Sequence, residues 1–166
     1  KEGEARCDSM NQKELYNLAT PENPVLQMHA FHRKPKIDSE MNADDVDPDQ
    51  FRGLQAVLEL CIGARVLLTH NKWVEAGLVN GAFGIVRGYV WPPGGGPNAA
   101  EASLHEPLCV VVEFDDVNLG TDINGQRRNF FKNLQIPENI DTSKWVPIFR
   151  ETIGAKDVEH VSRIQF

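Results

Sequence analysis

The sequence lacks the features that mark several common classes of protein. It has only three cysteines, Cys7, Cys61 and Cys109, whose odd number and wide spacing exclude a disulfide framework and favour a reducing, intracellular compartment. No apolar run approaches the roughly 18 uncharged residues of a membrane span. The charged N-terminus has no apolar signal core and no initiator methionine. We therefore expect a piece of a longer intracellular chain that has no contact with a membrane.

An excess of basic side chains is also absent. The 166 residues include 17 Lys and Arg against 24 Asp and Glu, which gives a formal net charge of −7. Only the segment 127–166 is net positive, with 7 basic and 5 acidic side chains. This distribution excludes a general surface for polyanions. Any contact with nucleic acid must be local, made by a few side chains and backbone amides.

The motifs of ATP hydrolysis are missing as well. A phosphate-binding loop ends in Gly-Lys-Ser/Thr, because the amides and the lysine surround the phosphates, and this sequence contains no Gly-Lys pair. The run Gly94-Gly95-Gly96 lacks both the lysine and a following helix, which favours a loop. His29 and His32 are three residues apart, but no Cys pair and no second His pair accompanies them at the spacing of a zinc site, which favours the end of a strand. We expect no catalytic residue and no metal site in these residues.

Short apolar segments separated by turn-forming residues make up most of the chain. One segment, 11–18, has the composition and spacing of a helix. The pair Asn80-Gly81 favours a tight type I′ hairpin turn, because both residues tolerate a positive φ. Runs that are apolar or rich in β-branched residues predict strands over residues 25–31, 57–69 (interrupted at Gly63), 84–91, 108–114, 145–151 and 158–166.

These elements predict a mainly β fold with some α. Short strands and glycine turns after residue 56 indicate a small antiparallel barrel. Two polar or Pro/Gly-rich segments, 92–107 and 118–144, favour long loops on that barrel. The segment 33–50 is polar and rich in Asp, which favours an acidic loop.

One ordered block of residues carries a resemblance to a known family. The chain has Gly63-Ala64-Arg65-Val66-Leu67-Leu68, then Asn71, then Gly77-Leu78-Val79-Asn80-Gly81-Ala82-Phe83-Gly84. This block resembles the petite-integration-frequency (PIF) family of RecD-like, superfamily-one DNA helicases, whose pattern is Gly-Ala-x-Val-Met-Leu, Asn, and Gly-Leu-Val-Asn-Gly-Ala-x-Gly. Leu67 replaces a frequent Met, which is a conservative change. Weaker similarities lie at Asn11 with Asn17 and at 163–166, so the resemblance is strong only over 57–91.

The resemblance implies a division of the chain into two parts. Residues 1–55 would be a partial RecA-like α/β domain (domain 2A) with an acidic loop, and residues 56–166 an SH3-like barrel (domain 2B) inserted in it. It also implies a full-length, ATP-dependent 5′-to-3′ DNA helicase that uses ATP and Mg²⁺, with both bound outside this piece. We expect the piece alone to be inactive and monomeric. The family suggests DNA repair, recombination or telomere maintenance, in the nucleus or mitochondrion if the source is eukaryotic.

Candidate contacts to single-stranded or fork DNA form two clusters, with Arg65 as an isolated candidate. Asn and Lys donate to phosphate, a glycine turn admits a phosphate to the backbone amides, and an aromatic ring stacks on a base. The second cluster alternates with Phe130 and Phe131, as nucleic-acid surfaces do. The first cluster consists of His70, Asn71, Lys72, Trp73, Asn80 and Gly81, and the second of Arg127, Arg128 and Lys132.

Each candidate also has a structural interpretation that needs no ligand. Asn80-Gly81 suits the turn itself, Trp73 suits a lid over the end of a barrel, and Lys72 suits a solvated surface charge. Arg65 either faces solvent on the outside of the barrel or reaches DNA. The alternative to a helicase is a non-catalytic, SH3-like module that binds a protein partner, because a fold alone does not settle function.

Overall fold

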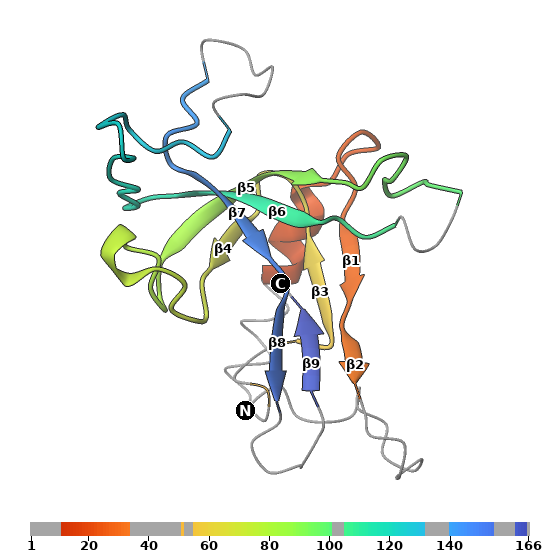
Figure 1. The fold of residues 1–166 in the computed structure, drawn as a ribbon. Helices are drawn as coiled ribbons and strands as arrows, with labels where there is room; N and C mark the ends of the chain where they lie inside the picture. Colours follow the sequence, from red (N-terminus) through yellow and green to blue (C-terminus); the bar gives the residue numbers. More distant parts are fainter. Residues whose placement is uncertain are drawn as a thin grey trace.

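The fold is known from a computed structural model that describes residues 11–33, 51, 55–100, 105–131, 140–154 and 162–165 (Figure 1). These residues form one helix, at 11–18, a single turn of 3-10 helix and nine strands, all paired antiparallel. The predicted mainly β fold with some α is confirmed. The acidic segment 34–50 and Lys132 lie outside the described residues.

The largest sheet has four strands in the order β4-β5-β6-β7. Its strands are β4 (Arg65–Leu67), β5 (Phe83–Val90), β6 (Cys109–Phe114) and β7 (Trp145–Phe149). Strand β6, with the sequence CVVVEF, is buried along almost its whole length, as its run of β-branched residues predicts. The pairing of β5 with β6 shifts at Arg87, between Val86 and Gly88, and forms a bulge that increases the local twist.

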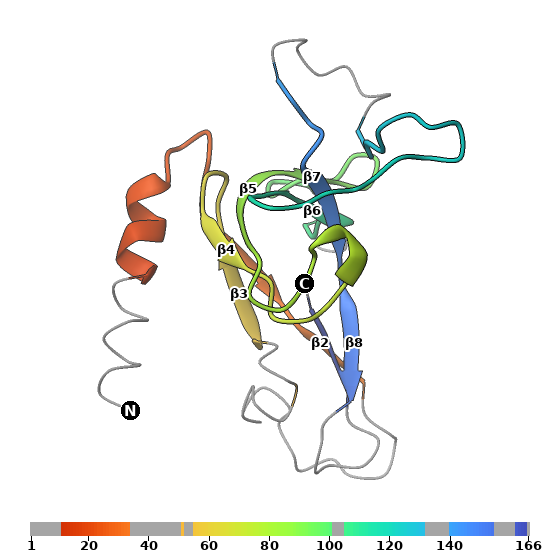
Figure 2. The same ribbon diagram turned by 90° about the vertical axis from the view of Figure 1, so that its left-hand side faces the viewer.

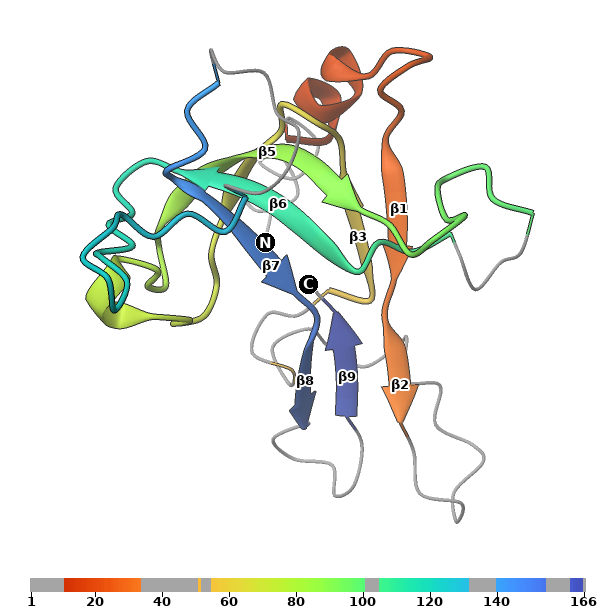
Figure 3. The same ribbon diagram turned by 45° about the horizontal axis from the view of Figure 1, so that its top comes forward.

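Two smaller sheets complete the fold. Strand β1 (Leu26–His29) pairs with β3 (Val57–Leu60), and β9 (Ser162–Gln165) lies between β2 (Phe31–Arg33) and β8 (Glu151–Gly154). The chain passes from sheet to sheet through short connections. Ala30 links β1 to β2, residues 61–64 link β3 to β4, and Arg150 links β7 to β8 (Figure 3).

These connections account for the differences from the sequence-based prediction. The strand predicted over 25–31 divides at Ala30 into β1, which pairs with β3, and β2, which pairs with β9 and ends at Arg33. The strand predicted over 145–151 ends at Phe149, and β8 begins after Arg150. Because the pairing partner changes at each connection, the described residues form three sheets and no single closed barrel. Strand β1 pairs with β3 across the predicted domain boundary at residue 55, and the boundary itself stays a prediction.

The core lies between the inner face of the four-stranded sheet and β3. Buried apolar side chains from β5, β6 and β7, among them Val86, Val112, Phe114 and Val146, meet Leu60 of β3. An open cleft of about 350 Å³ remains beside this core, lined by residues of β3 to β8. The sheets therefore surround an apolar interior that opens to solvent at one end.

The N-terminal helix lies on the same side of the molecule as β3 (Figure 2), and a polar cluster links the two. The Glu59 carboxylate accepts hydrogen bonds from Gln12 Nε2 at 3.3 Å and from the Tyr16 hydroxyl at 3.2 Å, and a third from Gln27 Nε2 at 2.8 Å. These donors lower the pKa of Glu59, Gln27 contributing most, because they favour its ionised form. Among the described residues, no helix is both long and apolar enough to cross a membrane.

Candidate nucleic-acid interface

The first predicted cluster lies on the connection 68–82, which joins β4 to β5. Trp73 and Leu78 form an isolated antiparallel bridge, in which Leu78 N donates to Trp73 O at 3.0 Å and Trp73 N donates to Leu78 O at 3.1 Å. Between them is the 3-10 helix η2 (Val74–Ala76), which ends at Gly77 in the left-handed conformation, with φ +81°. This connection is therefore folded back on itself and holds Trp73 in a defined place.

The predicted turn at Asn80-Gly81 forms, but it does not join two strands directly. Ala82 N donates to Val79 O at 2.9 Å across the turn, and Gly81 has φ +95°. The Asn71 side chain closes the connection, since its Oδ1 accepts from Asn80 N at 2.7 Å. The sequence prediction of a simple two-residue hairpin is wrong because β4 and β5 are joined by all of 68–82. This leaves Asn71 with a structural partner in the turn.

Trp73 brings the two predicted clusters together. The Arg128 guanidinium carbon lies 5.3 Å from the centroid of the Trp73 ring, within the range of a cation–π contact. Arg128 is fixed from its own loop, because its Nε donates to Thr121 O at 2.8 Å and its backbone N to Gly120 O at 3.0 Å. Arg127 is exposed and forms a bridge with Thr121. A cation and an indole ring thus meet from loops far apart in sequence.

His70 and Lys72 line the cleft. Lys72 Nζ lies 2.5 Å from a Glu151 carboxylate oxygen of β8, and its side chain is only 21% exposed. His70 Nδ1 lies 3.0 Å from Thr69 Oγ1, while its Nε2 is buried without a hydrogen-bond partner among the described residues. Lys72 is therefore part of an ion pair between the connection and β8, in place of the free surface charge considered from the sequence.

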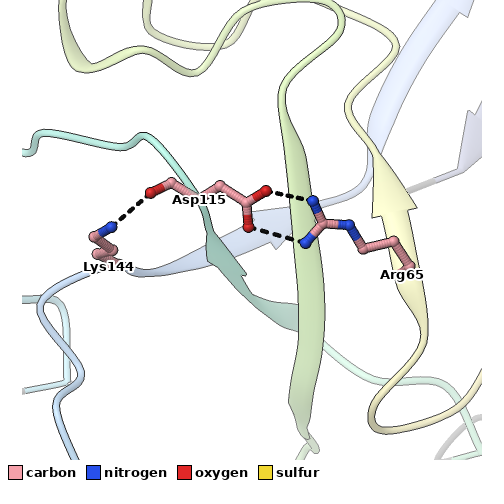
Figure 4. Close-up of polar contacts among 3 residues, drawn as sticks. All are labelled: Arg65, Asp115 and Lys144. Atoms are coloured by element: carbon pink, nitrogen blue, oxygen red, sulfur yellow. Dashed lines mark hydrogen bonds and ion pairs between the residues drawn. The ribbon is translucent and has the colours of Figure 1, made fainter.

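Arg65 lies on the exposed outer face of the four-stranded sheet (Figure 4). Its two terminal nitrogens bind the two carboxylate oxygens of Asp115, and its guanidinium carbon lies 5.2 Å from the centroid of the Phe83 ring. Lys144 Nζ donates to the Asp115 carbonyl oxygen at 2.5 Å. The Arg65 hydrogen bonds lower the pKa of Asp115, and Asp115 in turn raises the pKa of Arg65.

The site predictions remain untested as DNA contacts, but the structure shows how the side chains are arranged. Trp73 contacts Arg128, and Arg65 lies apart from both. Several partners of the predicted residues were not predicted from the sequence. Arg65 contacts Phe83 and Asp115, Lys144 binds the same turn as Arg65, and Lys72 pairs with Glu151. The only feature of the sequence that pointed to Asp115 was its position in the turn that follows the clearly predicted strand 108–114. Within the described ranges, no group of three or more His, Cys, Asp or Glu side chains is placed to hold a metal ion.

The sequence matches no protein-family model and no curated protein. The fold, in contrast, matches a region of solved DNA helicases. The Pif1 helicase of Candida albicans aligns with 98% of this chain and 32% of its own, at 19% identity and a TM-score of 0.54. Unliganded Pif1 from a Bacteroides species aligns with 98% of this chain and 35% of its own, at 18% identity and a TM-score of 0.46.

A third similar structure shows DNA unwinding at forked double-stranded DNA by two coordinating Pif1 helicases. It aligns with 98% of this chain and 25% of its own, at 18% identity and a TM-score of 0.49. At such identities the likeness establishes a shared fold, and we rest the comparison on the Candida albicans protein. This chain thus has a Pif1-like helicase fold, as the resemblance predicts, and it spans about a third of the length of that relative.

Proposed function

We propose that this chain is part of an ATP-dependent 5′-to-3′ DNA helicase and that it contacts and guides single-stranded DNA during unwinding. The observation that carries the proposal is the likeness of almost the whole chain to Candida albicans Pif1. Residues 56–166 would be its SH3-like 2B domain, and 1–55 part of its second RecA-like domain. We assign ATP and Mg²⁺ to other parts of the full-length protein, since this sequence has no Gly-Lys pair.

The arrangement of the sheets supports the SH3-like assignment. The sheet β1-β3 connects to the sheet β4-β5-β6-β7, which connects to the sheet β8-β9-β2. Ala30 then connects β2 of the last sheet to β1 of the first. The three sheets therefore succeed one another around the apolar cleft in a ring, joined through Ala30, residues 61–64 and Arg150. Small barrels commonly turn such corners by bends and bulges. An interrupted barrel of this kind has two exposed loops, 68–82 and 118–131, that approach each other at one place.

Those two loops supply the chemistry of a single-strand contact. The Trp73 ring and the Arg128 guanidinium are the two kinds of surface on which bases stack, and each stacked base contributes about 1–3 kcal/mol. Because Arg128 lies over Trp73, a base would stack on the guanidinium or enter between the two groups. Arg127 beside it would contact the phosphate backbone. Few cations are present, so we expect weak binding, micromolar or weaker.

The test is the binding of a fluorescent oligo-dT to this chain, followed by anisotropy over a series of salt concentrations. Arg128→Ala removes the stacked cation, and Arg87→Ala removes an arginine paired with Glu113 on β6, so both variants lose one charge. We expect Arg128→Ala to weaken binding about fivefold and Arg87→Ala to leave it within twofold, because only Arg128 meets an aromatic ring from the other loop. Equal losses, or binding that ignores salt, would refute the proposed contact.

One observation favours the alternative, a module that binds a protein partner. Ile123 is 99% exposed at the tip of an ordered turn, where Asp122 Oδ1 accepts from Asn124 N and Gln126 N, both at 2.9 Å. An apolar side chain held on such a turn suits an apolar pocket of another protein. Selection from a peptide library tests this function. Salt-insensitive capture of a peptide that Ile123→Ser abolishes, with no binding to oligo-dT, would favour the module.

A further inference from the structure

The exposed face around Arg65 is assembled by the register of three strands. Arg65 of β4 lies opposite Ile85 of β5, and Phe83 lies two residues before Ile85 on the same face. The turn after β6 brings Asp115 next to Phe83, since Asp115 N donates to Phe83 O at 3.0 Å. Lys144, just before β7, reaches the same turn. Arg65 therefore lies over an aromatic side chain that is 51% exposed, and Lys144 binds the backbone of the turn that carries the Asp115 carboxylate.

The contact between Arg65 and Asp115 has the geometry with which arginine also binds phosphate. A guanidinium donates two parallel N–H bonds to a carboxylate or equally well to a phosphate. Both side chains are about half exposed, at 51% and 41%, so a phosphate in solution can reach the guanidinium and compete with the carboxylate. The Phe83 ring under the guanidinium holds it in place when its anion is exchanged.

We propose that Arg65 and Lys144 form a binding site for a backbone phosphate of single-stranded DNA, and that Asp115 occupies this site when DNA is absent. Phe83 is a positioning residue that orients the Arg65 guanidinium. This inference rests on the proposed function, since it adds a second contact for the same strand. Asp115 then acts as an internal competitor, and its displacement limits the affinity of the chain for DNA.

The neighbouring residue supplies a matched control. Asp115→Asn and Asp116→Asn each remove one negative charge at the same turn. They differ because Asp115 is the carboxylate that binds Arg65. We expect Asp115→Asn to bind oligo-dT about fivefold more tightly than Asp116→Asn at low salt, because it alone frees the guanidinium. We further expect its slope of log affinity against log salt to be steeper by about 0.7, the value for one additional phosphate on a single strand.

A second variant confirms which cation is responsible. Adding Arg65→Gln to Asp115→Asn should return the affinity and the salt slope to those of Asp116→Asn. Asp115→Ser, which also lacks the carboxylate, should behave as Asp115→Asn does, and thermal unfolding of each variant verifies that it is folded. Equal affinities and slopes for Asp115→Asn and Asp116→Asn would overturn the inference.

The same measurements separate this inference from the proposed function. If oligo-dT binding depends on Arg128 but Asp115→Asn equals Asp116→Asn, the proposed function stands and the Arg65 site is refuted. If Asp115→Asn binds more tightly and Arg65→Gln reverses the gain while Arg128→Ala has no effect, the Arg65 site stands and the contact at Trp73 is refuted. Absence of salt-sensitive binding by all variants refutes both.

Discussion

The two faces of the four-stranded sheet are held by different forces. On the inner face, Val86, Val112 and Phe114 are almost fully buried and pack against β3. On the outer face near β4, Arg65 and Phe83 are about half exposed, and their neighbour Asp115 is linked to them by charge and hydrogen bonds. The side chains of the inner face are closely packed, so replacing one with a smaller or larger residue should cause a large loss of stability. The outer contacts remain accessible to solvent.

The strongest test of this contrast compares two phenylalanines on opposite faces. Phe114 is 2% exposed and Phe83 is 51% exposed. Phe114→Ala should lower the free energy of unfolding by about 3–5 kcal/mol, because it removes buried apolar surface and leaves a cavity. Phe83→Ala should change it by about 0.5 kcal/mol or less. Denaturant unfolding measures both, and similar losses for the two variants would contradict the division between the faces.

Two glycines of β5 provide the next test. A Cβ added to Gly84 would lie 2.6 Å from Val112 Cγ1 and 2.8 Å from the Glu113 carbonyl oxygen, whereas a Cβ at Gly88 would meet nothing within 4 Å. Gly84→Ala should therefore cost about 1–3 kcal/mol through overpacking. Gly88→Ala should be neutral or slightly stabilising, since it restricts the unfolded chain. A Gly88→Ala loss as large as that of Gly84→Ala would show that the close approach at Gly84 is not decisive.

A smaller effect is expected at the connection that carries Trp73. Asn71→Ala removes the acceptor for Asn80 N, so it should cost roughly 0.5–1.5 kcal/mol. Asn71→Asp keeps an Oδ acceptor in the same place and should retain most of the stability. Denaturant unfolding measures both Asn71 variants, and Phe114→Ala provides a reference for general destabilisation. Equal behaviour of the two Asn71 variants would contradict this role.

The strands were predictable where local chemistry decides them. The run LCVVVEF identified β6 because its β-branched side chains suit a strand buried on both sides, and glycine and proline marked the ends of its neighbours. The links at Ala30 and Arg150 carry no such signal. Both residues are compatible with a continuous strand, so the predicted barrel and the observed three sheets differ at positions where the chain changes its pairing partner.

The sequence predicted which residue types make up the candidate site, but it did not predict which side chains contact one another. Lys72, Trp73 and Arg128 follow from composition and local spacing. The bond from Arg65 to Asp115 spans 50 residues, and it depends on the register of β4 on β5 and on the turn after β6. A short sequence pattern does not determine how two strands align. The alternation of side chains shows which face of the sheet a residue occupies, but it does not show which residue lies opposite on the partner strand.

The smallest expected effect concerns Glu59, a polar contact outside both faces of the sheet. Its pKa lies below its ordinary value of 4.5, chiefly because Gln27 donates to the carboxylate, with Gln12 and Tyr16 adding to this and partial burial opposing it. A lowered pKa means that the folded state prefers the ionised form. The resulting stability is present above the ordinary pKa and is lost as the pH falls through the lowered value.

Glu59→Gln isolates this contribution, because the amide keeps the shape of the side chain and does not titrate. The variant should be less stable than the unmodified chain by roughly 0.5–1 kcal/mol at pH 7, and the difference should shrink as the pH falls below the ordinary pKa of 4.5. Other carboxylates with lowered pKa, such as Asp115 and Asp141, titrate in both proteins and cancel in the comparison. A difference that stays constant or grows as the pH falls would mean that the helix is attached by packing rather than by the charge of Glu59.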